Sequence, residues 1–187
     1  MRIATALGVS PVWLLHGEGK KEWTTSEAEI ETGILVWDAP EDLPPDENRV
    51  WISSYDFRLS AGNGHIQWEI REKQELPFDR KFFRDIGSKP TDCKIIDVHG
   101  DSMEPYLFSH DMVMIDIAKT IPRDGKVYAV LFEEEGFVKQ IFKESGGGLR
   151  LHSYNALYPD RIIPREHLDR VQILGQVVYR AGSGMYA

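Results

Sequence analysis

The sequence contains a single cysteine, Cys93, among its 187 residues. One thiol excludes an internal disulfide, and it leaves no cysteine cluster for a structural metal. Asp97 and His99 stand at strand spacing, but two side chains are too few to hold a metal by themselves. We therefore expect no metal and no cofactor.

Long apolar runs and a signal-peptide pattern are also missing. The sequence has no stretch of about 18 apolar residues, the length that a transmembrane helix needs. Its N-terminus does not show the charged, apolar and small-residue order of a signal peptide. We expect a cytoplasmic protein with no membrane partner.

Positive charge is scarce, because 22 Lys and Arg stand against 30 Asp and Glu, a net charge of −8. DNA binding needs clustered cations that neutralise phosphates. We therefore expect that these residues alone do not bind DNA. The length is sufficient for one domain of ordinary size with a buried core, plus a tail.

The sequence does contain a serine and a lysine that together predict a Ser-Lys hydrolase. Ser102 stands in Gly-Asp-Ser-Met-Glu-Pro at 100–105, and Lys139 stands in the strand-like segment 136–142. Alternation along that segment places the lysine on one face with Phe137 and Ile141. A lysine activates a serine only when its amine is neutral, and burial among apolar neighbours favours the neutral form.

Each of the two residues also has a simpler interpretation. Ser102, followed by Met-Glu-Pro, fits the N-cap of a helix. Lys139 fits a lysine on an edge strand, where its charge discourages aggregation. Residue patterns alone leave these alternatives open.

From Val98 to about Gly182, the sequence resembles the C-terminal domain of LexA and of lambda-type phage repressors, a family of self-cleaving Ser-Lys peptidases. The order and spacing of four segments agree with that family. These are His-Gly-Asp-Ser-Met-Glu-Pro at 99–105, Asp-Met-Val-Met-Ile-Asp at 111–116, Asp-Gly-Lys-Val-Tyr at 124–128 and Phe-Val-Lys at 137–139.

The resemblance implies a mainly β domain of twisted antiparallel strands, with α+β character at its edges. It also implies that Ser102 is the nucleophile and Lys139 the base, with backbone N–H groups near the serine as the oxyanion hole. Gln140 departs from the family, because many relatives carry arginine after the lysine. We expect this departure to matter little for the chemistry.

A bond to be cut follows from the same resemblance, because the family cleaves Ala-Gly or Cys-Gly upstream of the serine. Ser-Ala-Gly-Asn-Gly at 60–64 contains Ala61 and Gly62, which form the predicted cleavage site. Small residues let the backbone approach the serine closely. The alternative is a hairpin turn at Asn63 and Gly64 after the strand-like segment 50–55. The cleavage site and the hairpin turn are compatible if the loop moves between solvent and the active site.

Residues 1–17 resemble the last helices of a helix-turn-helix DNA-binding domain. Ser10 fits an N-cap, Pro11 a first helical position and Gly17 a helix end. The family's recognition helix would precede this segment. Two explanations stay open, a longer repressor of which this is a piece or a protein without a DNA-reading half; the local alternative is a short amphipathic helix.

These features predict three regions along the chain. They are the incomplete end of a helix-turn-helix domain at 1–17, an acidic linker with prolines at 18–49, and a LexA-like self-cleavage and dimerisation domain at 50–187. Within the last region, we expect a helix over 79–86 capped by Asp79. Strands are expected at 50–55, 93–98, 112–117, 127–132, 137–142, 149–152 and 171–179, with a hairpin turn at 146–148.

The expected function is that of a phage- or SOS-type transcriptional repressor. By the resemblance, it inactivates itself when Ala61–Gly62 is cut, stimulated by a RecA filament after DNA damage. The expected partners are a second copy in a homodimer, operator DNA through a complete N-terminal domain, and RecA or an antirepressor. The alternative is a LexA-fold accessory or interaction protein, UmuD-like or regulated by an antirepressor, without DNA binding of its own.

Overall fold

The computed structural model describes residues 43, 46–59, 66–133 and 135–182, and for 56–59 and 66–74 it describes the backbone alone. The chain divides into two units, 1–49 and 50–187. Nearly all described residues belong to the second unit. The predicted helical end at 1–17 and the predicted linker up to residue 42 lie outside the described residues.

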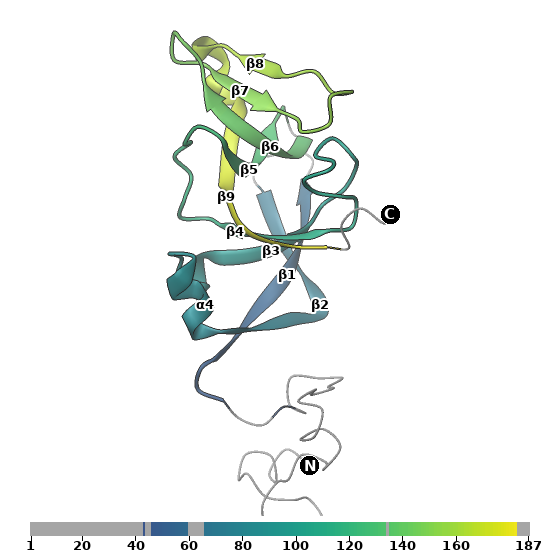
Figure 1. Cartoon of the computed structure of the whole chain (residues 1–187), viewed down its shortest axis with the longest axis vertical. Coiled ribbons are helices and arrows are strands. Elements are labelled where there is room, and N and C mark those ends of the chain that lie inside the picture. Colours follow the sequence, from purple (N-terminus) through teal and green to yellow (C-terminus); the bar gives the residue numbers. More distant parts are fainter. Residues whose placement is uncertain (1–42, 44–45, 60–65, 134, 183–187) are drawn as a thin grey trace, which may run out of the picture. The chain divides into compact units, whose positions relative to one another are not determined.

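In the part of the chain that the structure describes, nine strands form one sheet in the order β2-β1-β3-β4-β9-β5-β6-β7-β8 (Figure 1). The predicted mainly β fold is therefore confirmed. The strands are β1 (Arg49–Leu59), β2 (Ile66–Asp79), β3 (Cys93–Asp97), β4 (Met112–Asp116), β5 (Lys126–Phe132), β6 (Glu135–Lys143), β7 (Leu149–His152), β8 (Arg161–Ile163) and β9 (Val171–Ala181). Among the described residues, the helices are α4 (Arg80–Asp85) and two 3-10 turns, Pro90–Asp92 and Arg165–Arg170.

Strand β5 shows how one sheet builds two cores. Val127, Ala129 and Leu131 are buried in one hydrophobic cluster with residues of β3 and β4. Tyr128 and Val130 alternate with them and are buried in a second cluster with residues of β6, β7 and β8. Because side chains of a strand point alternately to opposite faces, an uninterrupted apolar strand indicates burial on both sides.

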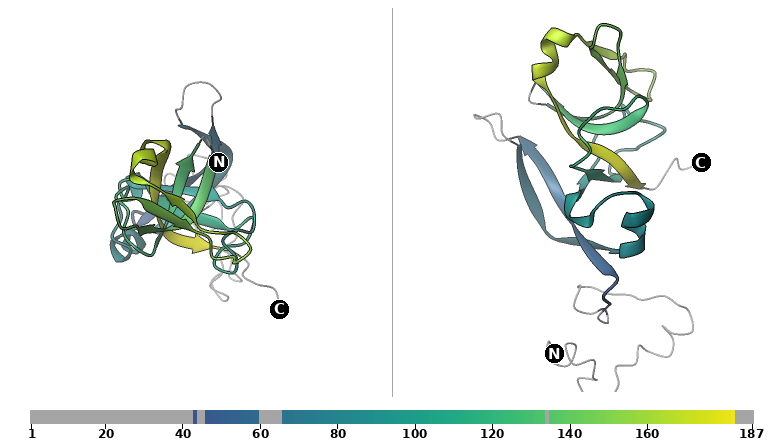
Figure 2. Two further views of the ribbon diagram at one scale, coloured as in Figure 1. Left: turned by 90° about the horizontal axis from the view of Figure 1, so that it is seen from above. Right: turned by 90° about the vertical axis from the view of Figure 1, so that its left-hand side faces the viewer.

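Helix α4 agrees with the prediction for 79–86. The Asp79 carboxylate accepts a hydrogen bond from the Lys81 N–H at 2.5 Å, which satisfies a free donor at the helix start. Phe83 is 1 % exposed in a third cluster, and Phe82 and Ile86 pack against the same cluster. The helix thus covers the β1–β3 end of the sheet (Figure 2).

Two strands were not predicted, and one pairing has an unexpected direction. β8 has three residues, too few for alternation to be recognised, and the sequence of β2 contains charged residues and a proline. β1 pairs with β3 in parallel, whereas the pairs from β3 to β8 are antiparallel. The predicted turn at 146–148 does join β6 to β7, where the Glu144 N–H donates to the Gly148 carbonyl at 2.9 Å.

Strand β9 lies inside the sheet, between β4 and β5. Its register shifts against both neighbours. A side chain at Gly175 would come within 2.7 Å of the Asp116 carbonyl oxygen, so glycine permits this close approach of β9 to β4. In the part of the chain described, no helix is long and apolar enough to cross a membrane.

Candidate active site

Lys139 lies on β6, one of the strands that form the second hydrophobic cluster. It pairs with Tyr128 of β5 and is 9 % exposed. Ile141 on the same face is buried in the second cluster, and Phe137 packs against that cluster, as the alternation predicted. Because this side chain is buried, the interpretation of Lys139 as an exposed charge that protects an edge strand is wrong.

Ser102 stands on the loop between β3 and β4. The base of this loop is closed by two hydrogen bonds, from the Val98 N–H to the Asp111 carbonyl at 2.7 Å and from the His110 N–H to the Val98 carbonyl at 2.8 Å. Met103 is 2 % exposed in the first cluster and anchors the loop beside the serine. Residues 101–106 form turns and no α-helix, so the interpretation of Ser102 as a helix N-cap is wrong.

Gly100 permits the turn that leads into the serine. Its φ is +85°, a conformation that side chains with a Cβ rarely adopt, although the space around it is open. The glycine of the 100–105 segment is therefore required by the backbone conformation, not by lack of room.

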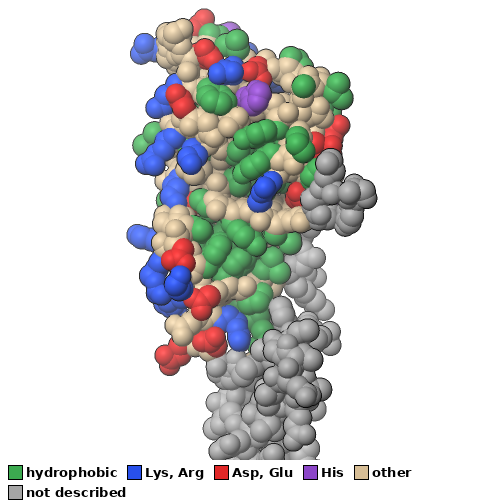
Figure 3. Space-filling view, in the orientation of Figure 1, with side chains coloured by type: hydrophobic (Ala, Val, Ile, Leu, Met, Phe, Trp, Pro, Cys, Tyr) green, Lys and Arg blue, Asp and Glu red, His purple; other side chains and the backbone are tan. Residues whose placement is uncertain are grey.

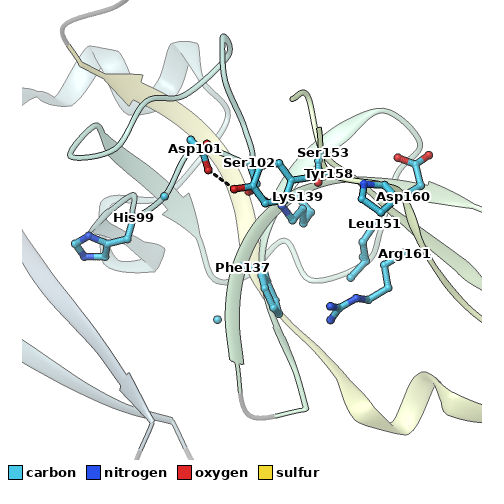
Figure 4. Close-up of a pocket in the computed structure, with 13 residues that line it drawn as sticks. His99, Asp101, Ser102, Phe137, Lys139, Leu151, Ser153, Tyr158, Asp160 and Arg161 are labelled. Carbon is cyan, nitrogen blue, oxygen red and sulfur yellow. Dashed lines mark hydrogen bonds between the residues drawn. The ribbon is translucent and has the colours of Figure 1, made fainter. Parts of the chain in front are cut away.

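The structure brings Ser102 and Lys139 together. The lysine Nζ lies 2.5 Å from the serine Oγ, within hydrogen-bonding distance. Figure 4 shows the two side chains meeting at the centre of a pocket, with His99 on one side and Arg161 on the other. The predicted cleavage residues, Ala61 and Gly62, lie outside the described residues.

The surroundings of Lys139 favour a neutral amine. Burial lowers the pKa of this amine from 10.5 to about 8, and the Arg161 guanidinium acts in the same direction. Asp101 acts in the opposite direction but does not cancel the effect. At pH 7 about one amine in ten is then neutral, against about one in 3,000 for an ordinary lysine.

The pocket around the pair has a volume of about 460 Å³ and is partly open. Its walls combine apolar and polar side chains, including Leu151, Ser153, Tyr158 and Arg161. Arg161 is held over the ring of Phe137, with 5.3 Å between the guanidinium carbon and the ring centroid. A smaller cavity of about 100 Å³ lies on the other side of the serine, against residues of β3 and β6.

One edge of β6 is open beside this pocket. β6 pairs with β5 from Glu135 to Ile141, but its pairing with β7 starts only at Gln140. Among the described residues, no strand therefore pairs with 135–139 on the β7 side. An extended peptide can add to such an edge through backbone hydrogen bonds.

Two backbone donors near the serine are also available. Among the described residues, the N–H groups of Ser102 and Met103 have no hydrogen-bond acceptor, whereas the nearby Glu104 N–H donates to the Asp101 carbonyl at 3.1 Å. Free N–H groups next to a nucleophile are suited to bind an oxyanion.

Sequence reasoning missed the part of the pocket that follows β7. Tyr158 and Arg161 line it together with Asp160, which accepts hydrogen bonds from Arg150 at 3.1 Å and is 2.6 Å from His152. The one signal in the sequence was a polar segment with Asn, Pro and Asp directly after a strand, and such loops often carry functional residues. In the described part, no group of three or more His, Cys, Asp or Glu is placed to hold a metal.

Comparison with known proteins adds independent information. The family model for S24-like peptidases matches residues 52–178, a range that includes both Ser102 and Lys139. The HTH-type transcriptional regulator PrtR of Pseudomonas aeruginosa is 34% identical over 183 residues, which cover 92% of this chain and 70% of PrtR.

Two further relatives show a similar extent of match. The repressor protein CI of Enterobacteria phage phi80 is 30% identical over 186 residues, covering 95% of this chain and 76% of that protein. An uncharacterised HTH-type transcriptional regulator of Haemophilus influenzae is 30% identical over 183 residues, covering 96% of this chain and 76% of the relative.

Proposed function

The chain belongs to the S24-like peptidase family, as its resemblance to LexA and phage repressors predicted, and from this premise we propose that it is a transcriptional repressor that inactivates itself by cutting its own backbone. The observation that carries the proposal is the 2.5 Å approach of the buried Lys139 amine to the Ser102 hydroxyl. PrtR is named a transcriptional regulator and the phi80 protein a repressor, which favours a repressor over an accessory protein.

The reaction we propose begins with neutral Lys139. Its amine takes the proton of Ser102 as the serine Oγ attacks the carbonyl carbon of Ala61. The free N–H groups beside the serine stabilise the oxyanion. The protonated lysine then gives its proton to the departing amine of Gly62, which leaves an ester between Ala61 and Ser102. Water, deprotonated by the same lysine, attacks the ester carbonyl; the lysine then returns this proton to the Ser102 Oγ as the Ala61 carboxyl group is released.

The substrate segment, in this proposal, enters as an added strand along the open edge of β6. Phe137 and Val138 stand at that edge, next to the two cavities that flank Ser102. Ala61 and Gly62 suit this position because small side chains avoid clashes where the backbone passes the serine.

Control of the reaction belongs to the proposal as well. A pKa of about 8 leaves most Lys139 amines charged at pH 7, so the unstimulated protein cuts slowly. A RecA filament or an antirepressor would act by changing the population of the conformation with the loop in the site. Cutting at Ala61–Gly62 would separate a DNA-binding part from a dimerising part, and operator affinity would fall through lost avidity.

The proposed homodimer would use a face of the sheet and not the backbone edge of β9, because β4 and β5 occupy both edges of β9. Figure 3 shows hydrophobic side chains gathered near the middle of one face. Tyr179 of β9 is 39% exposed and packs on Phe82 of α4 with 5.2 Å between ring centroids. Operator binding would come from a complete helix-turn-helix domain, and residues 1–17 resemble the end of one.

Intact-mass spectrometry of the purified chain at pH 7 and pH 9.5, with Ser102→Ala as control, tests the proposal. We expect fragments 1–61 and 62–187, formed faster at pH 9.5 and absent from the control. Gly62→Glu should block the cut while circular dichroism shows an intact fold. Cutting that persists in Ser102→Ala, or an uncut chain at both pH values, would contradict self-cleavage by this pair.

A further inference from the structure

Asn155 lies in the loop between β7 and β8, and each of its four polar groups has a partner. Its N–H donates to the Ser102 carbonyl and its Nδ2 donates to the Asp101 carbonyl, both at 3.1 Å. Its own carbonyl accepts from the Tyr158 N–H and its Oδ1 from the Leu157 N–H, both at 3.0 Å. Two bonds thus shape the loop, and two fix the residues that carry the nucleophile.

Tyr158 makes a further connection between the same two segments. Its hydroxyl donates to Asp101 Oδ1, and this hydrogen bond raises the pKa of the phenol. Its ring lines the pocket, 5.9 Å from the Lys139 Nζ. Asn155 and Tyr158 therefore contact residues 101 and 102 from a segment that is more than 50 positions later in the chain.

We propose that Asn155 and Tyr158 are positioning residues, which hold the backbone at Asp101 and Ser102 so that the serine hydroxyl stays within reach of Lys139. The inference rests on the proposed function, in which Ser102 is the nucleophile. Neither Asn155 nor Tyr158 takes part in proton transfer, because the hydrogen bonds of both end on Asp101, on the Ser102 carbonyl or within their own loop.

Loss of these contacts should reduce the reaction rate more than the stability of the fold. The contacts to Asp101 lie at the exposed surface, where water competes for both partners and a hydrogen bond contributes little to stability. The hydrophobic anchors of the serine loop, Met103 and Leu107, are buried separately in the first cluster. By contrast, moving a nucleophile by about 1 Å can cost about 10²-fold in rate.

The test compares Tyr158→Phe and Asn155→Ala with a matched control, Tyr154→Phe. Tyr154 stands in the same loop and stacks on Tyr106 at 4.8 Å between centroids, but no described hydrogen bond involves its hydroxyl. The readout is labelling of Ser102 by an alkyl fluorophosphonate at pH 9.5. In this reaction the serine Oγ bonds to phosphorus, fluoride leaves and Lys139 takes the serine proton.

At pH 9.5 most Lys139 amines are neutral, so the rate reports the placement of the serine and not the charge of the lysine. Asn155→Ala removes the side-chain bonds to Asp101 and Leu157 and keeps the backbone bond to Ser102. We therefore expect labelling to slow about tenfold in each of Tyr158→Phe and Asn155→Ala. Tyr154→Phe should label at the wild-type rate. The melting temperature of the two slow variants should fall by no more than about 3 °C.

A double variant separates positioning from general damage. If Tyr158 acts through Asp101, the double variant Asp101→Ala, Tyr158→Phe should label no more slowly than Asp101→Ala alone. Full additivity of the two losses would overturn the proposed route. Wild-type labelling rates in both Tyr158→Phe and Asn155→Ala would also overturn the proposal. A fall in labelling rate that matches the unfolded fraction of each variant and disappears on cooling would overturn it as well.

The labelling experiment also separates this inference from the proposed function. If Ser102 is labelled in the wild-type chain but that chain never cuts itself, self-cleavage alone is contradicted. The labelling rates of the variants then still decide whether Asn155 and Tyr158 are positioning residues. Ser102 that does not label in the wild type contradicts both.

Discussion

Two lysines of the same domain differ in how the protein treats their charge. Lys119 has three acceptors, which are the Gly87 carbonyl at 2.7 Å, the Ser88 hydroxyl at 2.8 Å and the Asp116 carboxylate at 3.1 Å. Lys139 is more deeply buried, and its one described hydrogen-bond partner is the Ser102 hydroxyl.

A lysine that acts as a base must be buried without a carboxylate partner. Around Lys119, the Asp116 carboxylate and two neutral acceptors replace the hydration that the ammonium loses. A buried ammonium without such a partner loses its proton more readily, and the pKa of about 8 for Lys139 follows. Lys119 thus serves the fold, and Lys139 is suited to chemistry.

Removal of Lys139 should abolish most of the activity, whereas removal of Lys119 should change it little. Lys139→Ala should reduce self-cleavage at pH 9.5 by at least about 10³-fold, because Lys139 is the described side chain that hydrogen-bonds the Ser102 hydroxyl. Lys119→Ala should cut at a near wild-type rate at a temperature where it is folded. The measurement is quantitative mass spectrometry of both chains over time. Equal losses of cleavage rate in the two variants would contradict the assignment of Lys139 as the base and Lys119 as a structural residue.

A carboxylate placed beside Lys139 should make it resemble Lys119. Ser153 is buried and lines the same pocket, so Ser153→Asp should raise the pKa of Lys139. We expect the midpoint of the pH–rate profile to move above pH 8 by at least about one unit and the rate at pH 7 to fall about tenfold or more. Ser153→Asn is the neutral control. An equal shift of the pH–rate midpoint in Ser153→Asn would indicate that the larger side chain changes the shape of the pocket, and not that the added charge acts on Lys139.

Stability should respond in opposite directions when each lysine becomes methionine. Lys139→Met should raise the free energy of unfolding at pH 7 by about 1–3 kcal/mol, because the cost of burying the charge disappears. Lys119→Met should lower it by about 2–3 kcal/mol, because Asp116, whose side chain is 3% exposed, loses its partner. Urea unfolding measures both, and a loss in Lys139→Met would contradict this account.

The difference in the free energy of unfolding between Lys139→Met and the wild type should depend on pH. Below pH 8 the folded and unfolded states both carry the charged Lys139 amine, and its burial cost is present in full. Between pH 8 and 10.5 the folded state releases this proton first, so the lysine's cost falls as pH rises. The stability advantage of Lys139→Met over the wild type should therefore shrink across this window.

The smallest effect is expected from the arginine in the pocket. Arg161→Gln removes a positive charge that lowers the pKa of Lys139, so the midpoint of the pH–rate profile should rise by less than about one unit and the rate at pH 7 should fall severalfold. Arg165→Gln changes an exposed arginine outside the pocket lining and is the control. A downward shift in Arg161→Gln would contradict the electrostatic argument.

Local features of the site could be predicted from the sequence. Alternation placed Lys139 on the buried face of β6, and resemblance paired it with Ser102; the capped helix after Asp79 followed from its cap and its apolar positions. These predictions depend on neighbours in the chain or on a family pattern that extends through the whole segment.

Contacts between distant segments could not be predicted in the same way. Asn155 and Tyr158 lie beyond β7, and nothing local indicates that they reach Asp101 and Ser102. The parallel pairing of β1 with β3 is equally nonlocal. Arg161 belongs to β8, whose three residues are too short to show a pattern. The cleavage residues Ala61 and Gly62 remain a prediction.

Whether Lys139 is held as a base can be decided by NMR titration of the lysine side chains in Ser102→Ala, a variant that should not cut itself at high pH. ¹³C-labelled lysine gives one Cε signal per residue, and Lys139→Met in the same background assigns the signal of interest. The account predicts that this one signal titrates near pH 8. If it instead titrates near the ordinary lysine value of about 10.4, Lys139 is not held as a base.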